Sequence, residues 1–65
     1  MDDTKQREPL TEDQRRAIFK ALVEQQDSGT PVEASRIETG KAFSVSTDEI
    51  ILIEQEGLDS QWPPL

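Results

Sequence analysis

Carboxylates and a small number of cations are the chemically active side chains of this chain. Its 65 residues include fourteen Asp and Glu, seven Lys and Arg, no His, no Cys and no Tyr. The commonest general base and the thiol nucleophile are therefore missing, and no carboxylate has an obvious orienting partner. Glycine-rich phosphate loops and calcium loops are also missing from the sequence. We expect no catalytic residue, no metal and no cofactor, and hence no enzyme.

The positive charges stop before the last third of the chain. Residues 1–41 hold all seven basic and nine acidic residues, a net charge of −2, whereas residues 42–65 hold five acids and no base, a net charge of −5. Phosphate groups are repelled by such a segment unless another surface compensates. The C-terminal part is therefore a poor candidate for contact with nucleic acid.

Five basic residues are candidates for contact with a nucleic-acid backbone. Acidic residues stand close to all of them in the sequence, so solvated helix faces with weak ion pairs are the favoured interpretation and phosphate contact is the alternative. The five candidates are Arg15, Arg16, Lys20, Arg36 and Lys41.

Three start signals predict three helices. Each is a capping box, in which a Ser or Thr at the N-cap is followed three residues later by Glu or Gln. The boxes are Thr11–Gln14, Thr30–Glu33 and Ser46–Glu49, and Pro31 is preset for a first helical position. The predicted helices cover residues 12–26, 31–43 and 47–56.

Glycines predict where helices end or approach each other. Gly29 can end the first helix, and Gly57 can end the third, with Leu58 folding back onto the last turn. Gly40 lies inside the second predicted helix, at a cost of roughly 1 kcal/mol relative to Ala. That cost suggests that another backbone comes close to Gly40.

A β-hairpin is the alternative for the C-terminal half. Residues 43–46 alternate in polarity and residues 50–53 are rich in β-branched side chains, so the two runs could pair across residues 47–49. The connecting residues lack the Gly or Asn that such a turn usually needs. Three helices are therefore preferred.

Apolar spacing predicts an all-α, three-helix, helix-turn-helix-like domain over residues 10–58. Steeply crossing helices need a small residue in one helix, a compact turn, and apolar residues in the next helix. A disordered tail over residues 1–9 and an extended, Pro-containing tail over residues 59–65 flank this domain. The predicted core consists of Ile18, Leu22, Ile37, Phe43, Val45, Ile50 and Ile53.

Residues 36–57 resemble the helix-turn-helix in region 4 of bacterial sigma factors. That family has a small residue, a phenylalanine and a Gly-Val-Ser/Thr turn, followed by an aliphatic residue shortly before Ile-Glu. Residues 42–46 (Ala-Phe-Ser-Val-Ser), Ile50 and the pair at 53–54 match this pattern. The resemblance implies a DNA-binding fold in a transcription setting, with Thr47 and Gln55 as base-reading residues. Residues 54–58 and 62–65 also resemble short, uncharacterised bacterial proteins, which implies a family but indicates no particular activity.

The predicted reading helix departs from the sigma-factor pattern in its exposed residues. Its first turn carries two acids, and the four apolar residues 50–53 point around the whole helix, so Ile51 and Leu52 cannot both be buried by the domain. Either the C-terminal tail covers them through Trp62, or they form a protein interface or a dimer contact. Trp62 itself either packs on the domain or contacts the partner.

Two functions follow from these residues. The preferred one is a transcription-associated interaction module that docks a protein partner, or a second copy, through Ile51, Leu52 and Trp62. The alternative is a small DNA-binding regulator. It would hold phosphates with the five basic candidates and read bases with Thr47 and Gln55.

A cytoplasmic location is the expectation from composition. The chain has no cysteine, no apolar run near the roughly 18 residues of a membrane span, and no apolar stretch at its acidic N-terminus of the kind a secretory signal needs.

Overall fold

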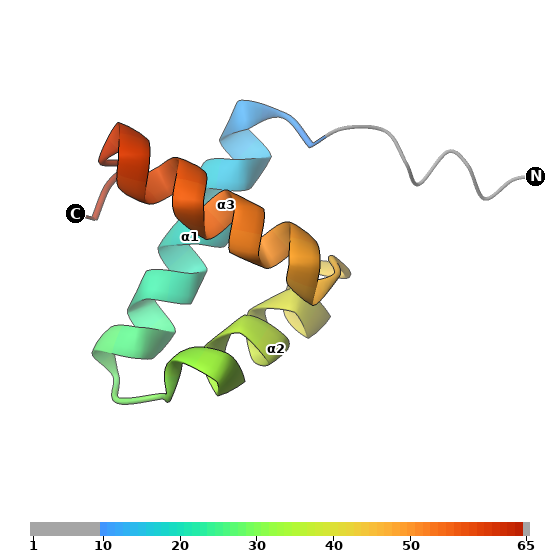
Figure 1. Ribbon diagram of the computed structural model, residues 1–65, viewed down its shortest axis with the longest axis vertical. Coiled ribbons are helices and arrows are strands. Elements are labelled where there is room, and N and C mark those ends of the chain that lie inside the picture. Colours follow the sequence, from blue (N-terminus) through green and yellow to red (C-terminus); the bar gives the residue numbers. More distant parts are fainter. Residues whose placement is uncertain (1–9, 65) are drawn as a thin grey trace, which may run out of the picture.

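A computed structural model describes residues 10–64 of the chain as three helices (Figure 1). These are α1 (Glu12–Asp27), α2 (Val32–Phe43) and α3 (Thr47–Ser60). The all-α, three-helix prediction is confirmed, and the hairpin alternative is wrong because residues 47–60 form one helix. The predicted disordered tail, residues 1–9, lies outside the described part.

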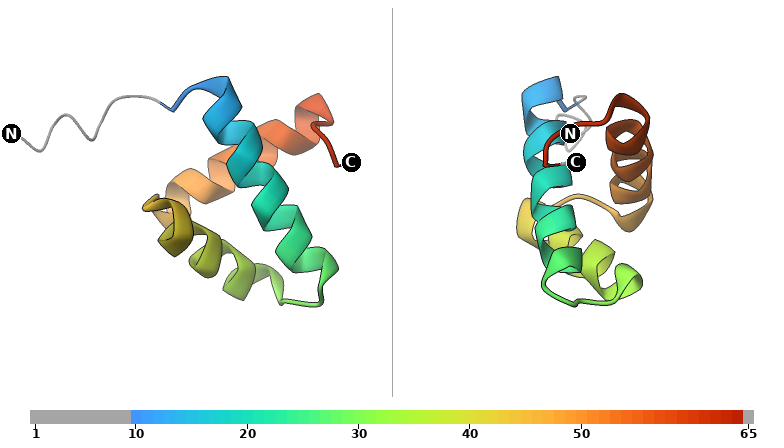
Figure 2. Two further views of the ribbon diagram at one scale, coloured as in Figure 1. Left: turned by 180° about the vertical axis from the view of Figure 1, so that it is seen from behind. Right: turned by 90° about the vertical axis from the view of Figure 1, so that its left-hand side faces the viewer.

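The three helices pack pairwise, and α3 crosses over α1 near the N-terminal half of α1 (Figures 1 and 2). α2 joins the far end of α1 to the start of α3. The segment after α3 returns toward α1, as the side view in Figure 2 shows. Within residues 10–64, every helix is too short or too polar to cross a membrane.

Two of the three predicted capping signals form. The amide of Gln14 donates to the Thr11 hydroxyl at 3.1 Å, and the Gln14 side chain accepts from the Thr11 amide at 2.8 Å, a complete capping box. The Ser46 hydroxyl accepts from the amide of Glu49 at 3.2 Å. Both helices thus start where the sequence predicts.

The predicted Thr30 cap is wrong. Pro31 is the N-cap of α2, in an extended conformation (ψ 150°) and without a side-chain cap, and the helix begins at Val32. A residue that precedes proline is itself biased toward extended backbone, so Thr30 is drawn away from the helix. Its amide instead donates to the carbonyl of Gln25 at 3.1 Å and closes the end of α1.

All three helices end in the same way, with one residue at positive φ. These residues are Gly29 (φ 99°), Ser44 (φ 58°) and Gln61 (φ 54°). In each case the amide of the following residue donates to the carbonyl five residues earlier, as in a Schellman motif. The three bonds are Thr30 to Gln25 at 3.1 Å, Val45 to Gly40 at 2.8 Å, and Trp62 to Gly57 at 3.0 Å.

The predicted end of the third helix is wrong. α3 does not stop at Glu56 but continues through Gly57 to Ser60, so Asp59 and Ser60 are helical rather than part of an extended tail. The glycine serves packing instead of termination. A Cβ built on Gly57 would lie 2.7 Å from Cγ of Phe19 and nearer still to two other ring atoms.

Phe19 is the centre of the core. It is fully buried, together with Ile18, Leu22, Ile50 and Ile53, and the ring of Trp62 meets it edge-on with centroids 6.0 Å apart. Aromatic pairs favour this edge-to-face geometry. The predicted core included neither Phe19 nor Trp62, whereas these two residues supply the aromatic volume of the observed core.

The prediction that Ile37 and Phe43 are core residues is wrong. They are 45 % and 40 % exposed, and Val45 only packs against the edge of the core. The inward line of α2 consists of small residues, since Ser35, Thr39 and Gly40 are its buried positions. Small side chains allow close helix approach but leave no room for inward-pointing large ones.

The two buried hydroxyls of α2 are matched by amides from α1. The side-chain nitrogen of Gln26 donates to the Ser35 hydroxyl at 3.1 Å, and that of Gln25 lies 3.4 Å from the Thr39 hydroxyl. Buried polar groups require such partners to avoid a desolvation penalty. The contact between α1 and α2 therefore includes two side-chain hydrogen bonds between polar residues.

The close approach expected at Gly40 is confirmed. A Cβ at this position would lie 2.6 Å from the carbonyl oxygen of Val45, which belongs to the connection between α2 and α3. Glycine is thus required here because the backbone of the turn passes directly over it.

We predict that Gly57→Ala destabilises the domain by about 1–3 kcal/mol, since the added methyl would overpack the Phe19 ring. Helix propensity alone predicts the opposite sign, a gain of about 1 kcal/mol. Urea denaturation followed by circular dichroism measures the change. Ser60→Ala, at an exposed position of the same helix, is the control and should shift stability by only a few tenths of a kcal/mol. A stabilised Gly57→Ala variant would contradict the close contact.

Candidate functional site

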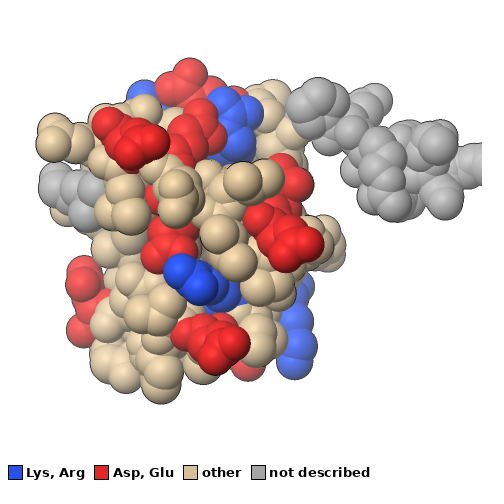
Figure 3. Space-filling view, in the orientation of Figure 1, with Lys and Arg blue, Asp and Glu red and all other residues tan. Residues whose placement is uncertain are grey.

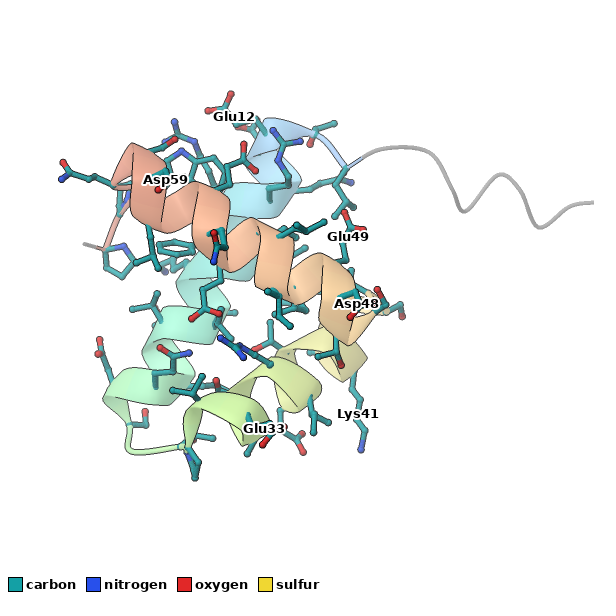
Figure 4. All side chains as sticks on the ribbon, in the orientation of Figure 1. Glu12, Glu33, Lys41, Asp48, Glu49 and Asp59 are labelled. Carbon is teal, nitrogen blue, oxygen red and sulfur yellow. The ribbon has the colours of Figure 1, made fainter. Side chains whose placement is uncertain are left out.

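The outer side of α3 presents one straight line of side chains. Asp48, Leu52, Gln55 and Asp59 follow one another at intervals of four, three and four residues, so they lie on one face of the helix. The two acids stand at opposite ends of α3 in Figure 4. The opposite face, Ile50, Ile53 and Gly57, is buried in the domain.

Aliphatic side chains lie on this line and beside it. Leu52 is 65 % exposed and Leu58 is 53 % exposed, while Ile51 is half-buried. The predicted site contained Ile51 and Leu52 but missed Leu58, because the helix was expected to end at Gly57. Continuing the helical pattern past that glycine would have placed Leu58 beside Ile51, seven residues later. We call Asp48, Ile51, Leu52, Gln55, Leu58 and Asp59 the α3 face.

Acids border the α3 face at both ends. Figure 3 shows uncharged surface between groups of carboxylates, and Figure 4 places Asp48 and Glu49 at the start of α3 and Asp59 near its end. No Lys or Arg of residues 10–64 lies within 4 Å of these three carboxylates. The aliphatic residues are therefore exposed between negative charges that the described part of the domain does not neutralise.

The other two acids of α3 hold it against its neighbours. Glu56 receives two hydrogen bonds from the guanidinium of Arg15 on α1, at 2.8 and 3.2 Å, and Arg15 also donates to the carbonyl of Leu10 at 2.6 Å. Arg36 on α2 donates to Glu54 at 2.9 Å. These part-buried pairs flank α3 on both sides, so both arginines have a structural role.

Two more basic candidates are paired within α1. Arg16 lies 2.7 Å from Glu12 and Lys20 lies 3.3 Å from Glu24, both across one helical turn. Of the five, only Lys41 has no carboxylate of residues 10–64 within 4 Å. The structure thus places four of the five cations in four separate ion pairs.

The remaining candidates are placed as follows. Thr47 and Gln55 are exposed on α3. Trp62 is only 4 % exposed, with the guanidinium carbon of Arg16 at 5.1 Å from its ring centroid, so the domain buries it and does not present it to a partner. One expectation from the sequence is that the tail covers Ile51 and Leu52 through Trp62. The tail does pack on the domain, because Trp62 meets Phe19, but it leaves Leu52 uncovered.

A second apolar feature lies between the start of α1 and the turn after α2. It is an open hollow of about 180 Å³, lined by Leu10, Gln14, Ala17, Ile18, Phe43 and Val45. It explains the partial exposure of Phe43. Its lining carries no charged group that would indicate a ligand.

Comparison with protein-family models finds no match, and no curated protein and no solved structure is significantly similar to the chain. Its function is therefore inferred from its own residues and their geometry.

We predict a measurable coupling between Arg15 and Glu56. A double-mutant cycle with Arg15→Met and Glu56→Gln should give about 1 kcal/mol at low salt, because the pair is bidentate and part-buried. The exposed Lys20–Glu24 pair is the matched control, with roughly 0.3–0.5 kcal/mol expected for an i,i+4 pair. Both couplings are measured by urea denaturation at low and high salt. Equal couplings for the two pairs would contradict the structural role of Arg15.

Proposed function

We propose that this chain is a non-catalytic interaction domain that docks a protein partner through the α3 face. The observation that carries this proposal is the exposure of Leu52 and Leu58 on the outer side of a helix whose inner side is fully packed. Apolar side chains that adjoin each other on a surface and are bordered by polar groups are typical of interaction sites. Ile51 adds a half-buried aliphatic group beside them.

The proposed setting is transcription, in the cytoplasm. This part rests on the resemblance of residues 36–57 to sigma-factor region 4 and on the connection between α2 and α3. That connection is three residues long, and Ser44 has the positive φ that the family's turn glycine adopts readily. The likeness supports the scaffold more strongly than it supports the reading of DNA, since a fold hosts many functions.

We predict that the double variant Ile51→Ser, Leu52→Ser loses partner capture. Each substitution removes an aliphatic group from the α3 face, and a loss of 1.4 kcal/mol corresponds to about a tenfold weaker complex. Capture by the immobilised domain, quantified by mass spectrometry, and sedimentation velocity measure the effect. Circular dichroism first establishes that the variant is folded.

The matched control is Val32→Ser, Ile37→Ser, which removes two aliphatic groups that are 48 % and 45 % exposed on α2. It should capture the same proteins as the unaltered domain. Unchanged capture and an unchanged oligomeric state in the α3 variant would rule out docking through this face.

DNA binding is the second candidate function. Its support is the helix–turn–helix connection, with Thr47 and Gln55 exposed on α3. Weighing against it are the absence of Lys and Arg from α3 and the ion pairs that engage Arg15 and Arg36. A protein that reads bases also needs phosphate contacts to hold its position on the duplex.

We predict weak duplex binding at most in a titration at low and moderate salt. A phosphate-binding surface would show an affinity that falls steeply with salt, with a slope of about −0.9 for each phosphate contact. Steep salt dependence, lost in the triple variant Arg15→Ala, Arg16→Ala, Lys20→Ala, would favour the DNA-binding alternative and overturn the docking proposal.

A further inference from the structure

The charges around the α3 face define what its partner must carry. Of the five cations in residues 10–64, four lie in ion pairs with carboxylates of the same part of the chain. Seven carboxylates there have no such pair: Asp13, Asp27, Glu33, Glu38, Asp48, Glu49 and Asp59. Asp48 and Asp59 belong to the α3 face and Glu49 adjoins it, so an occupant with positive charge at those places would be favoured.

The spacing of these charges is fixed by the helix. Asp48 and Asp59 are eleven residues apart, which is about 16 Å at 1.5 Å per residue, and eleven residues return to nearly the same side of a helix. The α3 face is therefore a ridge along the helix, with Asp48 and Asp59 at its ends (Figure 4). Leu52 and Gln55 lie between the two acids, and Ile51 and Leu58 lie beside that line.

A second copy of the chain does not fit this ridge. Two α3 faces packed antiparallel would bring Asp48 of one copy opposite Asp59 of the other, and parallel packing would bring each acid opposite itself. Like charges placed directly opposite each other destabilise a contact. The same repulsion disfavours a phosphate backbone.

A helix fits the ridge better than an extended peptide does. Recognition of an extended segment by strand addition depends on unpaired backbone groups at a sheet edge, and α3 uses its backbone groups within the helix. A partner helix satisfies its own backbone and packs its side chains between those of α3. Two helices packed side by side also match a straight 16 Å ridge along their whole length.

We propose that the partner of the α3 face is a basic amphipathic helix. Its Lys or Arg residues lie about eleven residues apart, opposite Asp48 and Asp59, and its aliphatic residues between them meet Leu52 and Leu58. This inference rests on the proposed docking function and names the chemistry of the docked segment.

The position of Asp59 adds a second line of support. It lies in the last turn of α3, which contains no basic residue, so its charge opposes the helix dipole. A partner cation at this end relieves that repulsion, whereas in the free domain the acid lowers stability. Asp27 occupies the same kind of position in the last turn of α1, and therefore provides a matched control.

The test uses a synthetic helical peptide as probe. The peptide carries two Arg residues eleven apart with two Leu residues between them. Fluorescence anisotropy of the labelled peptide, titrated with the full chain, gives its Kd. One comparison peptide has the same composition with the Arg residues three apart, and another carries Glu in place of both Arg residues. We expect the first peptide to bind about two- to fivefold more tightly than the peptide with Arg residues three apart, which can reach only one of the two acids. It should bind at least about tenfold more tightly than the Glu peptide, a difference of about 1.4 kcal/mol.

Three variants of the domain locate the contact. Asp48→Asn and Asp59→Asn should each weaken binding of the first peptide by about two- to fivefold, the effect of one exposed ion pair. Asp27→Asn removes the same charge from a helix end and should leave the Kd unchanged. Because Asp59→Asn and Asp27→Asn relieve similar helix-dipole repulsion, both should raise Tm by about 2 °C, so stability alone cannot explain a difference in binding.

The outcomes separate this inference from the proposed function. The basic-helix partner is overturned if the three peptides bind equally or if the first peptide does not bind. It is also overturned if the first peptide has equal affinity for the Asp48→Asn, Asp59→Asn and Asp27→Asn variants. If the Ile51→Ser, Leu52→Ser variant still loses partner capture in that case, docking through the α3 face stands with a partner of other chemistry. If that variant also behaves as the unaltered domain does, both proposals fail.

Discussion

The contact between the Phe19 ring and the backbone of Gly57 is the constraint on which the rest of the structure depends. It sets the distance between α1 and α3, because a side chain at position 57 would occupy the space of the ring. It also leaves an edge of Phe19 for Trp62, whose amide closes α3 on the carbonyl of Gly57. The backbone of one glycine thus takes part in helix packing, in the hydrogen bond that closes α3 after Ser60, and in the burial of the C-terminal tryptophan.

This contact also shapes the candidate site. Since Gly57 packs within α3 instead of ending it, the helix continues for another turn and carries Leu58 and Asp59 onto its outer side. Without that turn the α3 face would lose its second exposed leucine and the acid at its far end. The position of Gly57 inside the helix therefore determines both the contact with Phe19 and the extent of the α3 face.

Ion pairing divides the acids of α3 into two groups. Glu54 and Glu56 pair with arginines of α2 and α1 and hold the helix in place, whereas Asp48, Glu49 and Asp59 remain outside such pairs within residues 10–64. A basic residue engaged with a part-buried carboxylate contributes little to the external field. The outer side of α3 consequently keeps its negative charge, whereas Arg15 and Arg36 are engaged in ion pairs within the domain.

The amino-acid sequence by itself determined the number of helices and two of their three starting points, because capping by Thr11 and Ser46 involves residues only three apart and needs no tertiary contact. It also indicated the close approach at Gly40 and that Ile51 and Leu52 cannot both be buried by the domain. Only the tertiary structure decided that Ile37 and Phe43 lie outside the core, that Gly57 packs against Phe19, and that Arg15 and Arg36 pair with Glu56 and Glu54. Those outcomes depend on which residues from distant parts of the chain meet, and neither local propensity nor periodicity contains that information.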